Sequence, residues 1–166
     1  MNKRKKAIGS VEFASNLLGL RELLVDFRPE NFFLNPDINA VFDDKNYIIC
    51  FNETWLCKAS ADEIMVTAFH ETRHAYQKAN IDFPEFFVER ESIETVRQWK
   101  IDFDNYKPAH DLKNLEGKLE YLTQSIELDA IAYTHYQMNK LFYMDTVVPN
   151  MITDIVNELM KNHSKR

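Results

Sequence analysis

The stretch His70-Glu71-Thr72-Arg73-His74 contains the residue types and the spacing that could do chemistry. On an α-helix, positions i and i+4 lie about 40° apart, so both imidazoles could reach one metal ion. The glutamate lies roughly 100° from the first histidine and would stand beside an open coordination position. Two histidines and a glutamate in this order supply two ligands and the general base of zinc-dependent hydrolases. The stretch therefore predicts a catalytic zinc site on one helix.

A helix start signal precedes this motif. Ser60 followed by Glu63 indicates a capping box, immediately before an apolar periodic segment. The predicted helix has a broad apolar arc and a polar side. The arc contains Ile64, Met65, Ala68, Phe69, Ala75, Tyr76 and Ala79, and the polar side contains Glu63, Thr67, His70, His74 and Gln77. The two histidines therefore need a partner other than the core; the alternative is an ordinary amphipathic helix with two hydrogen-bonded or surface histidines.

A third metal ligand should come from later in the chain, because catalytic zinc takes three protein ligands and a water molecule. Residues 125–133 place two acids in an apolar run of helical spacing, which is costly unless the acids bind something. Glu127 and Asp129 diverge by about 200° on a straight helix, so only one can face the metal. We predict Glu127, since Ser125 as N-cap would place it in a first turn that favours negative charge. Asp129 is then a structural partner of Arg73 or of a tyrosine hydroxyl, and the alternative for Glu127 is stabilisation by the helix dipole alone.

With this distant glutamate, the chain resembles the small gluzincin metallopeptidases. Glu127-x-x-Ala130-x-x-Tyr133 is similar to the Glu-x-x-Ala-x-x-Phe pattern of ImmA/IrrE-type proteins, and the resemblance covers roughly residues 38 to 143. It implies a zincin-like domain that binds one zinc ion, with Glu71 as catalytic base. The zinc ligands that it implies are His70, His74 and Glu127.

Two related patterns do not extend to this chain. The large thermolysin-like enzymes carry an acid four residues after the third ligand, where this chain has Ile131. The metzincin pattern is absent, because Gln77 and Asn80 stand where its glycine and its third histidine belong.

The predicted activity is hydrolysis of a peptide or protein substrate by zinc-activated water, with Glu71 transferring the water proton to the leaving amine. His135, Tyr106 and His110 are unranked candidates for stabilising the oxyanion or supporting the ligands, together with Asp129; a solvated loop histidine is the alternative for His110. Two other function classes remain open. One is a zincin-like regulatory or interaction protein that binds metal and cleaves one partner or nothing, and the other is a helical binding module with a chance motif.

Composition limits the remaining function classes. The 166 residues, 45% of them apolar, predict one domain with a real core. A formal charge of −6 argues against a nucleic-acid binder, and no segment is apolar enough to be expected to span a bilayer. Cys50 and Cys57 have no close metal-ligand spacing and are expected as small hydrophobes of a cytoplasmic protein. The sequence does not predict an oligomeric state.

The order of elements predicts an α+β, helix-dominant fold with a small β-hairpin before the active-site helix. Residues 1–9 are expected to be a basic flexible N-terminus, residues 10–162 a single zincin-like domain, and residues 163–166 a frayed tail. By resemblance, the sheet edge would pair with an extended substrate; the alternative is that the hairpin only covers the core. Helices are predicted over 11–24, 84–99, from 125 to about 144 and over 149–160, strands over 38–42 and 47–51, and a loop over 102–114.

Overall fold

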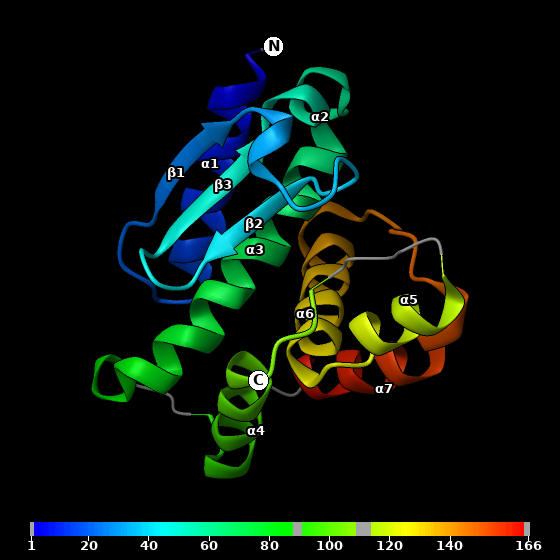
Figure 1. The fold of residues 1–166 in the computed structure, drawn as a ribbon. Helices are drawn as coiled ribbons and strands as arrows, with labels where there is room; N and C mark the ends of the chain where they lie inside the picture. The colour runs from blue at the N-terminus through cyan, green and yellow to red at the C-terminus, as the bar shows by residue number, and fades with distance from the viewer. Residues whose placement is uncertain (1, 88–90, 109–113, 165–166) are drawn as a thin grey trace. The chain divides into compact units, whose positions relative to one another are not determined.

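A computed structural model describes residues 2–87, 91–108 and 114–164. In these residues the chain forms seven α-helices and one three-stranded sheet, which confirms the predicted α+β, helix-dominant class (Figure 1). The chain divides into two compact units, Met1–Val88 and Glu89–Arg166. A single domain over residues 10–162 stays a prediction.

The first unit contains the sheet and the long helix that carries the His-Glu-x-x-His motif. Its elements are α1 Lys3–Leu17, β1 Leu24–Arg28, the 3-10 turn η1 Glu30–Phe32, β2 Ala40–Asp43, β3 Ile48–Asn52, α2 Glu53–Lys58, α3 Ala61–Asp82 and the 3-10 turn η2 Pro84–Phe86. The strand order is β1-β3-β2, with β1 parallel and β2 antiparallel to β3. The predicted hairpin is therefore confirmed to within two residues, and β1 is an additional strand.

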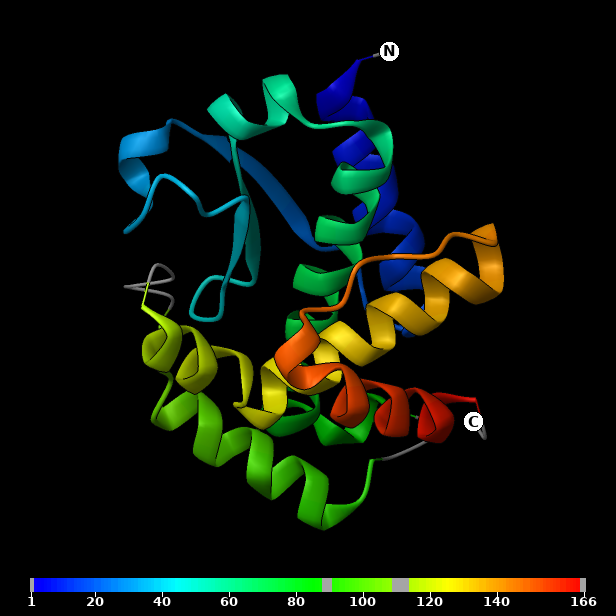
Figure 2. The same cartoon turned by 90° about the vertical axis from the view of Figure 1, so that its right-hand side faces the viewer.

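Helices α1 and α3 pack together beneath one face of this sheet (Figure 2). Side chains from all three strands and both helices form the core there, because alternate residues of each strand point to the same face. The fully buried members of this core are Ala7, Ile49, Phe51, Ile64 and Ala68. The core fixes α3 against the sheet and so fixes the direction in which its motif faces.

The basic N-terminus is helical from Lys3, where the sequence analysis expected a flexible segment over residues 1–9. Asn2 caps α1 by accepting a hydrogen bond from the Lys5 amide, and Ala7 is fully buried. Arg4 forms an ion pair with Glu53 of α2, and its guanidinium lies 5.0 Å from the centre of the Phe27 ring. The basic side chains therefore have partners across the unit, which a sequence pattern does not reveal.

Helix α1 also ends earlier than predicted. It stops at Leu17, and Gly19 follows with a φ of 65°, a left-handed conformation that glycine adopts without strain. Leu24, the predicted last residue of the helix, instead begins β1. The chain thus turns back into the sheet where the periodic pattern alone favoured a continuing helix.

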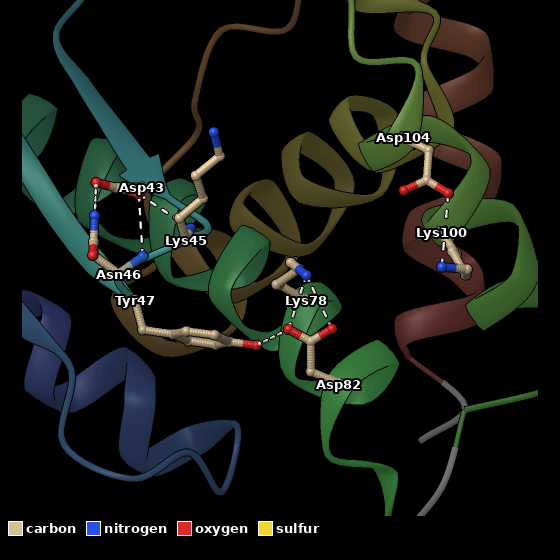
Figure 3. A network of polar contacts seen from close by, with 8 residues as sticks. All are labelled: Asp43, Lys45, Asn46, Tyr47, Lys78, Asp82, Lys100 and Asp104. Atoms are coloured by element: carbon tan, nitrogen blue, oxygen red, sulfur yellow. Dashed lines mark hydrogen bonds and ion pairs between the residues drawn. The ribbon is translucent and has the colours of Figure 1, made fainter.

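A polar network ties the β2–β3 hairpin to the C-terminal turn of α3 (Figure 3). The Tyr47 hydroxyl donates a 2.7 Å hydrogen bond to Asp82, and Lys78 reaches both oxygens of the same carboxylate at 2.8 and 2.9 Å. Burial, followed by the neighbouring Asp82, raises the pKa of Tyr47, so the hydroxyl stays a donor at neutral pH. The turn of the β2–β3 hairpin is therefore joined to the C-terminal end of α3.

The buried Asn52 side chain joins β3 to α2 and to the loop before β2. Its oxygen accepts hydrogen bonds from the Thr54 and Trp55 amides at 3.0 and 3.3 Å, and its nitrogen donates to the Ile38 carbonyl at 3.0 Å. Asn52→Ala is expected to lower the free energy of unfolding by about 2 kcal/mol, because a helix cap and a buried partner are lost together. Urea unfolding followed by tryptophan fluorescence measures this, and Asn16→Ala, on the exposed side of α1, is the control. Equal unfolding midpoints for the two variants would contradict the capping role.

The second unit is helical in its described residues. Its elements are α4 Ile93–Asp104, α5 Leu115–Leu122, α6 Ser125–Phe142, the 3-10 turn η3 Asn150–Ile152 and α7 Thr153–His163. Helices α6 and α7 pack against each other (Figure 2), and a small core forms from Leu122, Ala132, Ile152 and Val156. No described helix has an apolar stretch long enough to cross a membrane.

Several predicted boundaries in this part of the chain are wrong. The predicted helix over 84–99 is replaced by η2 and by α4, which begins only after Ser92 accepts a hydrogen bond from the Thr95 amide. Helix α4 then continues to Asp104, into the predicted loop, and α5 was not predicted. Helix α7 extends to His163, the first residue of the expected tail. Residues 109–113 and 165–166 lie outside the described residues.

Candidate metal centre

The capping box that the sequence predicts starts helix α3. The Ser60 hydroxyl accepts a 3.2 Å hydrogen bond from the Glu63 amide, and the Glu63 carboxylate accepts a 2.7 Å hydrogen bond from the Ser60 amide. These hydrogen bonds hold the pKa of Glu63 below its usual range. The predicted apolar arc is buried along its whole length. Both observations confirm the helical register that brings the two motif histidines to one side of α3.

His70 and His74 present their Nε2 atoms to each other. The two atoms are 3.0 Å apart, and the ring planes are nearly perpendicular at 88°. His74 is also held at its other nitrogen, because its Nδ1 lies 2.9 Å from Oε1 of the fully buried Gln77. An amide oxygen accepts hydrogen bonds, so this contact favours the tautomer with the proton on Nδ1 and a lone pair on Nε2. This is the tautomer that a metal bound at Nε2 requires.

Gln77 contacts a candidate ligand, and the sequence analysis assigned it no role beyond the polar side of the helix. Its signal was available: a position three residues after His74 lies on the same helical face and is within reach of the imidazole. Metal-ligating histidines usually donate their second N–H to such a partner, so Gln77 has the position of an orienting group.

The polar residues in the C-terminal half of α3 are mostly buried, whereas Glu63 near its start is exposed. Glu71, Arg73 and Gln77 are all less than one tenth exposed. The Thr72 hydroxyl donates to the Ala68 carbonyl at 2.7 Å, and the Asn80 amide donates to the Tyr76 carbonyl at 2.9 Å, as buried polar groups require. The carboxylate of Glu71 is therefore shielded from bulk water; it directly follows His70 and precedes His74 by three residues.

Glu127 lies in the first turn of α6, within the second unit, and is only 1% exposed. Its Oε1 accepts a 3.0 Å hydrogen bond from the Tyr106 hydroxyl. Tyr106 follows α4 and was predicted as one of several candidates for the oxyanion or for support of the ligands. In the structure it contacts the predicted third ligand directly.

Asp129 has a different partner from Glu127, as the divergence of the two side chains predicts. Its Oδ1 lies 3.3 Å from Nε2 of His163 on α7. The His163 ring also packs against the rings of Tyr133 and Tyr136. Asp129 therefore links α6 to α7, with a histidine as a partner that the sequence prediction did not name.

The two histidines predicted as oxyanion candidates have different outcomes. His135 is buried on α6, and its Nδ1 is hydrogen bonded to the Thr146 hydroxyl. His110 lies outside the described residues. Neither observation assigns an oxyanion role.

The predicted ligands lie in different units: His70 and His74 are on α3 of the first unit, and Glu127 is on α6 of the second. Imidazole and carboxylate side chains are of the kinds that could hold a metal ion. The fold and this set define the chain as a helix-dominant α+β protein with a His-Glu-x-x-His helix and a buried glutamate on a later helix. No protein-family model matches the chain, and no curated protein or solved structure matches it.

Proposed function

We propose that this protein is a zinc-dependent metallopeptidase in which His70, His74 and Glu127 hold one zinc ion. The observation that carries the proposal is the imidazole pair on α3, whose Nε2 atoms are 3.0 Å apart. Two nitrogens bound to one tetrahedral zinc ion at about 2.05 Å are separated by about 3.3 Å. A small adjustment of the rings would therefore allow both nitrogens to bind the same ion.

The chemistry of the donors supports zinc over the common alternatives. Two imidazoles and one carboxylate are a ligand set of catalytic zinc sites, whereas calcium and magnesium prefer oxygen ligands. Three protein ligands leave a fourth position for water. The resemblance of the motif to small gluzincin peptidases agrees with this set, and it is the basis for proposing a peptide or protein as substrate.

The chain's own residues supply the proton transfer. When bound, the zinc ion polarises the scissile carbonyl and lowers the pKa of water that it binds. Glu71 follows His70 directly and is buried, so its carboxylate is protected from competition by bulk water. We assign to it the removal of the proton from the attacking water and the delivery of that proton to the leaving amine. Gln77, in contact with Nδ1 of His74, favours the tautomer whose Nε2 is available to a metal ion.

The proposed location is the cytoplasm. Both cysteines are free thiols, Cys50 buried in the sheet and Cys57 exposed on α2, as in a reducing compartment. Burial raises the pKa of the Cys50 thiol, so it stays protonated and unreactive at neutral pH.

Zinc titration followed by a cleavage assay tests this function. Protein purified free of metal is expected to bind about one equivalent of zinc, and the loaded protein is expected to cut an unfolded polypeptide into fragments detected by mass spectrometry. A chelator should stop the cleavage and added zinc should restore it; chelator already saturated with zinc is the control.

The two steps of this test have separate meanings. Absence of stoichiometric zinc binding would overturn the metal site. Zinc binding without zinc-dependent cleavage would overturn the peptidase activity and favour a metal-binding regulatory or interaction protein.

A further inference from the structure

We propose that Tyr106 is a positioning residue that holds the carboxylate of Glu127 in place for metal binding. Hydrogen bonds at Asp102 and Lys107, on either side of Tyr106 in the sequence, hold Tyr106 itself in place. This inference rests on the proposed zinc site and deepens it. The observation behind it is the hydrogen bond between the Tyr106 hydroxyl and Oε1 of Glu127, at 3.0 Å. Both residues belong to the second unit, so the contact is internal to it.

The segment 102–107 is attached to the start of α6 at three successive places. Asp102 is the first: its Oδ2 accepts hydrogen bonds from the Ser125 hydroxyl and from the Ile126 amide, the latter at 3.2 Å. Gln124, the N-cap residue of α6, makes no capping hydrogen bond with its own side chain. Asp102 therefore satisfies amide and hydroxyl donors at this helix end, with a negative charge where the helix dipole favours one.

Gln124 uses its side chain for the second attachment. Its Oε1 accepts a 2.8 Å hydrogen bond from the Lys107 amide, and its Nε2 donates a 2.9 Å hydrogen bond to the Lys107 carbonyl. This paired contact fixes the backbone of the residue directly after Tyr106. Tyr106 thus lies between two anchored residues, and its ring also packs edge-on against Tyr121 at 6.5 Å.

The third attachment is the hydrogen bond from Tyr106 to Glu127, which joins an exposed residue to a buried one. Tyr106 is 43% exposed whereas Glu127 is 1% exposed. A buried carboxylate needs hydrogen-bond donors, and carboxylates that bind metals are usually oriented by such donors. The Tyr106 hydroxyl donates to Oε1 and so holds the carboxylate in one rotamer. The other oxygen, Oε2, would then be the one that binds the metal ion. The hydrogen bonds at Asp102 and Lys107 restrict the backbone on both sides of Tyr106, which agrees with a positioning role.

The effect on zinc affinity separates this role from a structural one. Tyr106→Phe removes only the hydroxyl and is expected to weaken zinc binding about tenfold, since loss of an orienting group typically costs ten- to a hundredfold. The melting temperature of the metal-free protein should change little, because the ring and its packing remain. Tyr136→Phe is the matched control, because Tyr136 lies on α6 with its ring against His163; its zinc affinity should equal that of the wild type.

A double-mutant cycle with Gln124→Ala tests the anchored segment. Gln124→Ala should weaken zinc binding by itself, because it frees the backbone beside Tyr106. In the Tyr106→Phe background it should have little further effect, because both changes act through the same hydroxyl. Isothermal titration with zinc chloride measures all four dissociation constants.

The outcomes distinguish this inference from the zinc site on which it rests. Zinc binding by the wild type that Tyr106→Phe leaves unchanged overturns the positioning role and leaves the site intact. Additive effects of the two substitutions overturn the link between the anchored segment and the hydroxyl. A wild-type protein that binds no zinc overturns both the site and the inference.

Discussion

Replacing Glu71 with glutamine is expected to abolish peptide hydrolysis while zinc stays bound. Glutamine has nearly the same shape as glutamate but cannot take a proton from water, so the general base is lost without disturbing the imidazoles on either side. General-base catalysis contributes about 10² to 10⁴ in rate, and a fall in kcat/KM of at least about 100-fold is expected. Cleavage of an unfolded polypeptide gives the rate, and elemental analysis gives the zinc content.

The matched control for this variant is Glu63→Gln on the same helix. Glu63 lies at the start of α3, is exposed and forms the capping box with Ser60. The same chemical change there should leave both activity and zinc content as in the wild type. If Glu71→Gln kept the wild-type rate, Glu71 would not be the base; if it lost zinc as well, Glu71 would have to be regarded as a structural or ligating residue.

Helix α3 was predictable because its signals are local. The capping box, the apolar arc and the two histidines one turn apart all depend on residues within a few turns of one another. The hairpin strands were also predicted to within two residues, since two short apolar runs flank the turn residues Asp43 to Asn46, and four consecutive residues of β3 are buried. Each of these features is settled by the segment in which it occurs.

Strand β1 was missed because its stability comes from a distant segment. Val25 and Phe27 alternate with Asp26 and Arg28, which agrees with a strand, but the apolar residues before them extended a helical pattern. The strand pairs in parallel with β3, so its hydrogen-bond partners come from residues 48–52. Parallel pairing across such a separation leaves no local sign in the sequence.

The contacts around the candidate ligands also fall into local ones, which the sequence can predict, and distant ones, which it cannot. Gln77 acts within one helix, so its contact with His74 could have been predicted from an i, i+3 spacing. The contact of Tyr106 with Glu127 and that of Asp129 with His163 join different helices. The sequence could only predict that the two acids diverge, and it left the identity of their partners open.

Glu127→Ala is expected to weaken zinc binding strongly, and Asp129→Ala is expected to leave it nearly unchanged. Loss of a ligand should cost more than loss of an orienting group, so we expect an effect above about 100-fold for Glu127→Ala. Asp129 instead pairs with His163 on α7, with both side chains mostly buried. Its removal should lower the free energy of unfolding by about 1 to 2 kcal/mol.

The stability of the metal-free protein also distinguishes Glu127→Ala from Asp129→Ala. Burying a carboxylate costs free energy, so a glutamate kept at 1% exposure for metal binding should not be needed for folding. Glu127→Ala is therefore expected to unfold at the same temperature as the metal-free wild type or at a higher one, whereas Asp129→Ala should unfold at a lower one. Thermal unfolding without metal, together with zinc titration, measures both properties for each variant. If Asp129→Ala lost zinc affinity and Glu127→Ala lost stability, the two acids would have the opposite roles. Both cannot be ligands, because side chains at these two positions of one helix cannot both face the metal.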